Sequence, residues 1–199
     1  TGSDLKKTKE QLPIAYIDRA KAIFTCCGNE MWEDGKQIYR KKFKPPKELI
    51  KYLEEQLETS EYPVRAGNHI EDRGTLLNFS IVGRDCSLEE RLKYHEYDIE
   101  NKERKIISKY IRKHWKELEA VIGGQISIDI YPMGNNKSQT LKHIYKKYIS
   151  SKIIFIGDGI ENNGNDYPLA KLMDNISYCD SYQTNGWEHT KQILESLND

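Results

Sequence analysis

An apolar run that ends in a carboxylate constrains the fold of this chain most strongly. Residues 153–156 are Ile-Ile-Phe-Ile, and Gly157-Asp158-Gly159 follow at once. A short apolar run between turn residues predicts a strand that is buried on both faces of a parallel sheet. Because open α/β sheets bind ligands at the carboxyl ends of their strands, we expect Asp158 to lie at a binding edge.

Two carboxylates near this edge suit a divalent metal. Asp166 follows Asp158 in the sequence Gly-Asn-Asp, and Mg²⁺ is usually held by one or two protein carboxylates, with water and phosphate in its other positions. The alternative is ordinary turn chemistry, because Asp166 stands two residues before Pro168, and an aspartate in such a place often begins a helix. The sequence leaves both interpretations open.

Composition and charge exclude several classes of protein. The 199 residues include 31 basic and 31 acidic side chains, so the formal net charge of zero gives no electrostatic case for a nucleic-acid partner. No segment approaches the roughly 20 apolar residues of a membrane span. The four cysteines lack the spacing of a zinc site or a disulfide framework. We therefore expect a cytoplasmic protein that binds neither nucleic acid nor a membrane.

Hydrophobic periodicity divides the chain into three stretches. Both ends mix helix and strand patterns, which predicts an α/β core. The middle alternates as strands at residues 75–82 and 125–132, and residues 100–121 have the period of one long charged helix. The predicted buried stripe of that helix is Ile106, Tyr110, Ile111, Trp115, Leu118 and Val121. In the core we expect helices at 4–12, 137–148 and from 167 and 188, and strands at 21–26, 153–156 and 176–179.

These patterns predict a discontinuous α/β core that is interrupted by an α+β insertion. The core is predicted to comprise residues 1–41 and 134–199, and the insertion residues 42–133. The insertion is expected to be an antiparallel sheet with helices on one face.

Polar residues of two kinds gather in the inserted region. Ser127 and Asp129 stand two apart on a predicted strand, so their side chains leave the same face, where they can bind hydroxyl groups. The alternative is a solvated face of a half-buried sheet. Arg73, Arg84 and Arg91 flank a second strand, and guanidinium groups match phosphate oxygens bidentately. The alternative for the arginines is a scatter over the surface.

Three further sequence features bear on chemistry. Ser87 and Glu90 have the spacing of a capping box, which places Arg91 in the first turn of a helix. Lys137 follows a Gly-Asn-Asn turn and either neutralises a phosphate or is solvated. The pair Cys26-Cys27 is interpreted as a buried strand end, because no base is placed to generate a thiolate.

Taken in order, these motifs resemble the eukaryotic-type phosphomannomutases of the haloacid dehalogenase superfamily, whose inserted α+β domain is a cap of the C2B type. The start of the chain resembles the family's second motif, and Lys137 matches the motif lysine. The other matching segments are residues 73–84 with 88–91, residues 123–132, and the acidic metal motif formed by Gly157-Asp158 with Asn165-Asp166.

The resemblance implies a Mg²⁺-dependent enzyme that interconverts hexose 6-phosphate and hexose 1-phosphate through a phospho-aspartate. A sugar 1,6-bisphosphate is the implied activator, GDP-mannose biosynthesis the implied context, and a homodimer through the cap the implied assembly. The implied roles are metal binding for Asp158 and Asp166, catalytic binding of the transferring phosphoryl group for Thr1 and Lys137, binding of the other phosphate for Arg73, Arg84 and Arg91, and binding of sugar hydroxyls for Ser127 and Asp129.

The chain departs from the family pattern in its first motif. That motif is an Asp-x-Asp pair, which supplies the phosphoryl-accepting aspartate and the general acid/base, and the printed sequence has no such pair. We therefore expect the chain as printed to be inactive. We also expect the first two core strands to lie upstream or on another polypeptide, since a parallel sheet without its centre leaves backbone groups unpaired.

Other readings of the function stay open. The turn at residues 25–29 differs from the family's usual sequence, which leaves the identity of the hexose undecided. A sugar-phosphate phosphatase of the same superfamily differs only in whether water or a sugar hydroxyl receives the phosphoryl group. A non-catalytic sugar-phosphate-binding protein that lacks the nucleophile is the alternative from another class.

Overall fold

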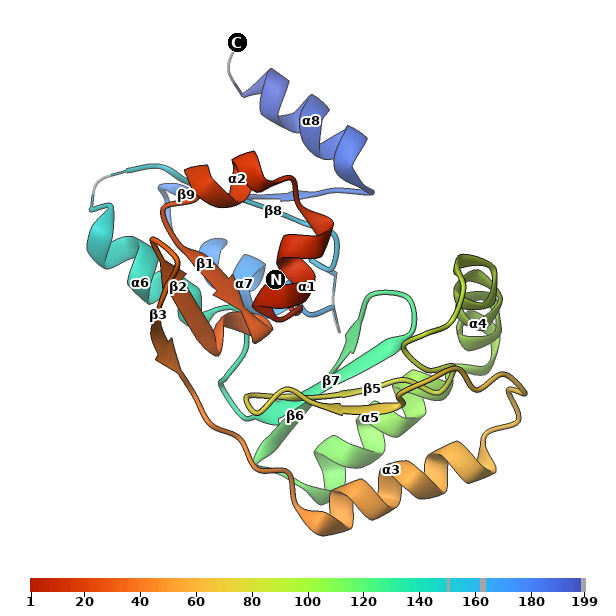
Figure 1. Cartoon of the computed structure of the whole chain (residues 1–199). Helices are drawn as coiled ribbons and strands as arrows, with labels where there is room; N and C mark the ends of the chain where they lie inside the picture. The colour runs from red at the N-terminus through yellow and green to blue at the C-terminus, as the bar shows by residue number, and fades with distance from the viewer. Residues whose placement is uncertain (150, 162–163, 198–199) are drawn as a thin grey trace. The chain divides into compact units, whose positions relative to one another are not determined.

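The computed structural model describes residues 1–149, 151–161 and 164–197. The chain divides into two compact units, Thr1–Asn135 and Asn136–Asp199, and each is described by itself (Figure 1). The described part contains no helix that is long and apolar enough to span a membrane. The domain limits at 41/42 and 133/134 stay a prediction.

The first unit begins with two short helices and an antiparallel three-stranded sheet. Asp4 caps the first helix, because its Oδ1 accepts a hydrogen bond from the backbone N–H of Lys7 at 2.7 Å. Asp34 and Gly35 both have positive φ, as a tight hairpin turn requires. The elements are α1 (Leu5–Gln11), α2 (Ile14–Arg19), β1 (Ile23–Thr25), the 3₁₀ helix η1 (Cys26–Gly28), β2 (Glu30–Glu33) and β3 (Lys36–Arg40).

The sequence patterns did not predict α2, and the strand expected at 21–26 is shorter, at Ile23–Thr25. β1 pairs antiparallel with β2. Residues 13–20 contain only short apolar runs, so the segment is too short to show the hydrophobic periodicity of a helix.

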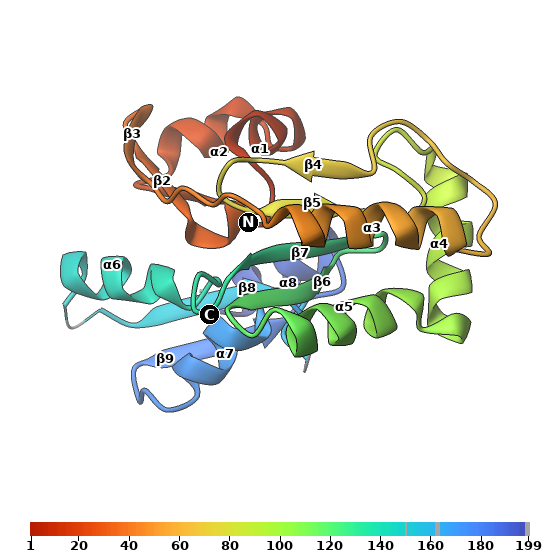
Figure 2. The ribbon, with the colours of Figure 1, turned by 90° about the horizontal axis from the view of Figure 1, so that it is seen from below.

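A four-stranded antiparallel sheet with helices on one face forms the rest of the first unit. Its strand order is β4-β5-β7-β6, and Figure 2 shows helices α3 and α5 running along the sheet. The strands are β4 (Ile70–Asp72), β5 (Leu77–Phe79), β6 (Leu118–Gly123) and β7 (Ser127–Pro132). The helices are α3 (Lys47–Thr59), α4 (Leu88–Asn101) and α5 (Glu103–His114).

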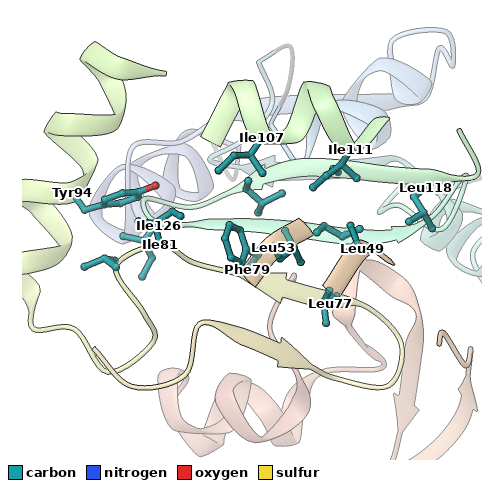
Figure 3. Packing of buried hydrophobic residues seen from close by; sticks show 14 of the residues in the cluster. Leu49, Leu53, Leu77, Phe79, Ile81, Tyr94, Ile107, Ile111, Leu118 and Ile126 are labelled. Atoms are coloured by element: carbon teal, nitrogen blue, oxygen red, sulfur yellow. The ribbon is translucent and has the colours of Figure 1, made fainter. Parts of the chain in front are cut away.

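Alternation along the strands separates an apolar face from a polar one. Leu49 and Leu53 of α3 pack with Phe79 of β5, Ile128 of β7 and Ile111 of α5 in one buried cluster (Figure 3). Because successive side chains of a strand leave opposite faces, the residues between these apolar positions point away from the helices. This second face carries the candidate site.

The long helix predicted over 100–121 is wrong. Lys102 adopts a left-handed conformation (φ 57°, ψ 29°) that ends α4 and begins α5 in a new direction. Ile106 is 62% exposed and Tyr110 41% exposed, whereas the neighbouring Ile107 and Ile111 are buried. From residue 118 the chain is β6, in which β-branched side chains pair with β7. The predicted stripe therefore joined residues from two elements with different phases.

The second unit is a two-stranded parallel sheet with helices packed on it. Its elements are α6 (Gln139–Lys147), β8 (Ile153–Gly157), α7 (Tyr167–Met173), β9 (Cys179–Gln183) and α8 (Trp187–Ser196). Leu141, Leu169 and Met173 form its buried cluster, against which Ile153 and Phe155 pack.

Two predictions for this unit need correction. β8 is not buried on both faces, because Ile154 points away from the cluster that covers its neighbours and is 40% exposed. Among the described residues β8 pairs only with β9. The strand expected at 176–179 begins later, because the backbone N–H of Ile176 donates to the carbonyl oxygen of Met173 in a turn after α7.

Candidate active site

A row of polar residues crosses the second face of the four-stranded sheet. Glu71 of β4 lies opposite Asn78 of β5, and Asn78 lies opposite Asp129 of β7, so the three side chains leave one face. The amide Nδ2 of Asn78 donates to Oδ1 of Asp129 at 2.6 Å. Ser127, two residues before Asp129, shares this face.

Burial decides against a solvated face. Ser127 and Asp129 are 4% and 3% exposed. A carboxylate at this depth is costly unless it is hydrogen-bonded or paired, and Asn78 supplies one such bond. The alternative of a solvated strand face is therefore wrong, while the role of these two residues toward a sugar stays a prediction.

The three predicted arginines (Arg73, Arg84 and Arg91) are here called the arginine cradle, and two of them, Arg73 and Arg84, contact residues of this face. Arg73 Nε and Nη2 both donate to Oε2 of Glu71, at 2.9 Å and 2.5 Å. Its Nη1 donates to the carbonyl oxygen of Gly2 at 3.0 Å. Arg84 Nη1 donates to Oγ of Ser127 at 2.9 Å.

Arg91 lies in the first turn of α4, as predicted. The hydroxyl of Ser87 accepts from the backbone N–H of Glu90 at 3.2 Å, and the carboxylate of Glu90 accepts from the backbone N–H of Ser87 at 2.7 Å. This reciprocal capping box fixes the start of α4.

Electrostatics show that the cradle gathers like charges. Burial lowers the pKa of Arg84, the nearby charge of Arg73 lowers it further, Glu71 opposes this, and Arg91 adds to the lowering. For Arg73, burial also lowers the pKa, but Asp129 and then Glu71 outweigh it, so the net pKa is raised. Arg84 is therefore within electrostatic reach of both Arg73 and Arg91.

Thr1 lies beside the end of β1. Its backbone nitrogen donates to the carbonyl oxygen of Phe24 at 3.1 Å, and its hydroxyl oxygen accepts from the backbone N–H of Ser3 at 3.2 Å. Its carbonyl oxygen accepts from the backbone N–H of Cys27 at 2.9 Å. The residue is thus held against the turn that follows β1.

Cys26 and Cys27 in that turn are fully buried. Burial, as the largest cause, raises the pKa of the Cys26 thiol to about 11, so the thiol stays protonated at neutral pH. This confirms the interpretation of a buried strand end.

In the second unit, Asp158 and Asp166 lie close to the end of β8. Asp158 directly follows the strand, and its side chain is exposed. Asp166 is buried: its Oδ1 accepts from Lys137 Nζ at 2.5 Å, and its Oδ2 accepts from the backbone N–H of Gly159 at 2.9 Å. Lys137 Nζ also donates to Oδ1 of Asn165 at 3.1 Å. Lys137 therefore belongs to the carboxylate cluster, and the alternative of a solvated lysine is wrong.

Asp166 precedes α7, but its carboxylate makes no capping bond to that helix. The helix start expected at Asp166 is confirmed, since Asp166 is the N-cap residue of α7, but its side chain contacts Lys137 and Gly159 instead of capping the helix. Burial raises the pKa of Asp166, but the charge and hydrogen bond of Lys137 and the Gly159 N–H outweigh it, and the net pKa is lowered. Asp166 is an anion at neutral pH.

Carboxylate oxygens are the type of ligand that Mg²⁺ prefers. Among the described residues no group of three or more His, Cys, Asp or Glu side chains lies in metal-binding proximity. One exposed and one buried carboxylate at the carboxyl end of a strand match the small protein share of a Mg²⁺ shell.

The sequence patterns missed Glu71, Asn78 and Asn165. Glu71 stands two residues before Arg73, and Asn78 is one of the outward positions of its predicted strand, so strand alternation could have pointed to both. Asn165 was part of the matched acidic motif, but its contact with Lys137 was not predicted.

The fold is similar to those of several solved structures. It resembles the N-terminally truncated, IMP-bound IMP-nucleotidase of Plasmodium falciparum, with a TM-score of 0.58 and 18% identity, over 100% of this chain and 56% of that one. It also resembles a haloacid dehalogenase-like hydrolase from Bacteroides thetaiotaomicron, with a TM-score of 0.55 and 12% identity, over 98% of this chain and 84% of that one. The class is therefore the haloacid dehalogenase-like fold, as predicted.

Sequence comparison identifies the family within this class. The model of the eukaryotic phosphomannomutase family matches residues 1–197. Phosphomannomutase of Drosophila melanogaster is 34% identical over 186 residues, which are 89% of this chain and 73% of that protein. Phosphomannomutase 1 of Dictyostelium discoideum is 32% identical over 205 residues, 98% of this chain and 80% of that protein. The chain belongs to the eukaryotic phosphomannomutases, which confirms the prediction of a phosphomannomutase-like enzyme.

Proposed function

We propose that the protein binds hexose phosphates and takes part in a Mg²⁺-dependent exchange of phosphate between the 1- and 6-positions of a hexose. The observation that carries this proposal is the arginine cradle beside the buried polar face that bears Ser127 and Asp129. Cations for a phosphate and oxygens for hydroxyl groups lie on one sheet face, as a phosphorylated sugar requires.

The cradle is assigned the phosphate that is not being transferred. Three guanidinium groups supply both the charge and the directed N–H donors for a phosphate dianion. Asp129 is held by Asn78, and Ser127 by Arg84, so both oxygens are in place before a sugar arrives. Such preorganisation spares the cost of ordering the site when the substrate binds.

The residues of the second unit are assigned the metal and the transferring phosphoryl group. Asp158 and Asp166 would hold Mg²⁺, which when bound neutralises charge on the phosphoryl oxygens. Lys137 would bind a phosphoryl oxygen, and its bonds to Asn165 and Asp166 fix its ammonium group in place. On the family resemblance, Thr1 of the first unit is also assigned a phosphoryl-binding role through its hydroxyl.

The wider setting of the proposal follows the family. We assign a hexose 1,6-bisphosphate as activator, the cytoplasm as location and GDP-mannose synthesis as context. A homodimer through the inserted sheet is also proposed. It is supported by exposed apolar residues at helical spacing on α4, where Leu88, Leu92 and Ile99 are 71%, 44% and 62% exposed.

The proposal is tested by titrating mannose 1-phosphate into the protein by calorimetry. We expect saturable binding that Arg84→Gln weakens about tenfold or more, because a shielded charged contact to phosphate contributes roughly 1.5–3 kcal/mol. Arg112→Gln is the matched control, since Arg112 is exposed on α5 and its loss changes the net charge equally. If Arg84→Gln binds as tightly as wild type, the cradle is not the phosphate site.

A further inference from the structure

Glu71 occupies two of the donors of the arginine cradle, Nε and Nη2 of Arg73. One carboxylate oxygen of Glu71, Oε2, accepts hydrogen bonds from both nitrogens. The same oxygen lies 3.9 Å from Nε of Arg84. The Nε–Nη2 edge of a guanidinium is one of the two edges that grip an oxyanion bidentately. On Arg73 this edge is therefore already taken by a carboxylate.

The charges explain why a carboxylate lies there. The side chain of Arg73 is only 8% exposed and that of Arg84 24% exposed, so water screens their repulsion weakly. The charge of Arg73 lowers the pKa of Arg84, and the charge of Glu71 raises it. Glu71 is thus the counter-ion that allows the two cations to lie together.

Exposure shows which partner is able to leave. The side chain of Glu71 is 34% exposed, whereas Arg73 is nearly covered and its Nη1 is tied to the backbone of Gly2. A glutamate on an edge strand of the sheet has free torsions and access to solvent. The arginine therefore stays, and the carboxylate is the group that exchanges.

We propose that Glu71 is an internal competitor of phosphate, whose carboxylate yields the Nε–Nη2 edge of Arg73 when a substrate phosphate enters the cradle. This inference rests on the proposed function. Glu71 lowers the affinity of the cradle for phosphate. In a mutase, one phosphate of the bisphosphate has to leave the cradle so that the other phosphate can bind there. The return of the Glu71 carboxylate to Arg73 would promote release of the first phosphate.

The test is the affinity for inorganic phosphate of Glu71→Gln, measured by calorimetry at one pH and ionic strength. Glu71→Gln should bind phosphate about three- to tenfold more tightly than wild type, as expected for the loss of one partly exposed ion pair. Glu58→Gln is the control, because Glu58 is exposed on α3 and its loss changes the net charge equally; its affinity should equal that of wild type.

A second variant keeps the proposal testable if Glu71→Gln fails to fold. Glu71→Asp keeps the charge but withdraws the carboxylate by about 1.5 Å, so its affinity should lie between wild type and Glu71→Gln. If a folded Glu71 variant binds phosphate only as tightly as wild type, or more weakly, the proposal is overturned, because Glu71 would then only orient Arg73.

Arg91→Ala separates this failure from failure of the proposed function. If wild-type binding depends on Arg91 but not on Glu71, the cradle stands and the competitor is rejected. If wild type shows no phosphate binding that Arg91→Ala removes, the proposed function fails and the competitor with it.

Discussion

At the scale of single residues, the two carboxylates near the end of β8 differ in exposure: Asp166 is buried and Asp158 is exposed. Asp166 makes hydrogen bonds with Lys137 and Gly159 through its two oxygens, whereas the side chain of Asp158 is exposed. Under the proposed function the first is a fixed anion and the second is the ligand most accessible to a metal.

Asp158→Asn should abolish Mg²⁺ binding with little change in the fold. The substitution removes one charge from the proposed metal shell but hardly alters side-chain volume. Wild type should gain thermal stability with added Mg²⁺, because a ligand that binds only the folded state raises its stability. Asp158→Asn should lose this gain in a thermal melt with and without Mg²⁺, while its midpoint without metal stays near that of wild type.

The control for this measurement is Asp174→Asn, which removes the same charge from an exposed position after α7. It should keep the Mg²⁺-dependent gain. An unchanged gain in Asp158→Asn would return Asp158 to the interpretation of a simple turn residue.

The ion pair of Asp166 with Lys137 should give the stability a defined pH dependence. The pKa of Asp166 is lower in the folded protein, because Lys137 and Gly159 outweigh the effect of burial. A carboxyl of this kind stabilises the fold above its unfolded pKa of about 3.9, and this contribution is lost as the pH falls through the folded pKa.

Urea unfolding of wild type and Asp166→Asn should therefore differ most near neutral pH. The difference in free energy of unfolding should narrow between about pH 5 and about pH 3, as the wild-type carboxylate takes up a proton. A difference that stays constant over this range would mean that the charge of Asp166 contributes nothing to folding.

At the scale of elements, the junction of α4 and α5 stores backbone strain. Lys102 has φ 57°, and left-handed conformations cost a residue with a Cβ roughly 1–2 kcal/mol. Lys102→Gly should raise the free energy of unfolding by up to about 1 kcal/mol, since glycine removes this strain but adds freedom to the unfolded chain.

Lys109→Gly provides the opposite case on the same helix. Lys109 is exposed within α5, where glycine should lower the free energy of unfolding by about 1 kcal/mol. Chemical denaturation of both variants measures the two effects. Equal destabilisation by both would contradict the account of Lys102.

Local patterns predicted the elements whose determinants are local. The alternation of Ile128 and Ile130 with Asp129 predicted β7 and its two faces, and the Ser87 capping box predicted the start of α4. The helix over 100–121 was wrong because two decisive facts are not local: a left-handed Lys102 and the pairing of β6 with β7.

The candidate site was predictable to a similar degree. Residue types and spacing left the arginines and the polar face as open alternatives, the family resemblance favoured them, and the chemical roles of these residues stay predictions. Glu71 was not predicted because its importance depends on its contacts with Arg73 and Arg84 in the folded chain. It also depends on the partial exposure of its side chain, which cannot be read from a sequence.

At the scale of the whole molecule, the proposed homodimer makes a prediction about mass. The exposed apolar side chains of α4 would be covered by a second copy, because a contiguous apolar surface favours association. Light scattering at tens of micromolar should give about twice the mass of the chain, and Leu88→Glu with Leu92→Glu should reduce it to a monomer. A monomeric wild type would reject this assembly.

The central claim is that elements distant in sequence build one phosphate site in the inserted sheet, and Arg91 tests it most directly. Arg91→Ala should raise the dissociation constant of glucose 1,6-bisphosphate, measured by calorimetry, about tenfold or more, since a shielded charged contact contributes roughly 1.5–3 kcal/mol. Arg91→Lys should recover only part of the affinity, because an ammonium lacks the bidentate fork, and the exposed Arg112→Ala should bind like wild type. If Arg91→Ala and Arg91→Lys both bind like wild type, Arg91 is a solvated helix residue and the cradle is not the phosphate site.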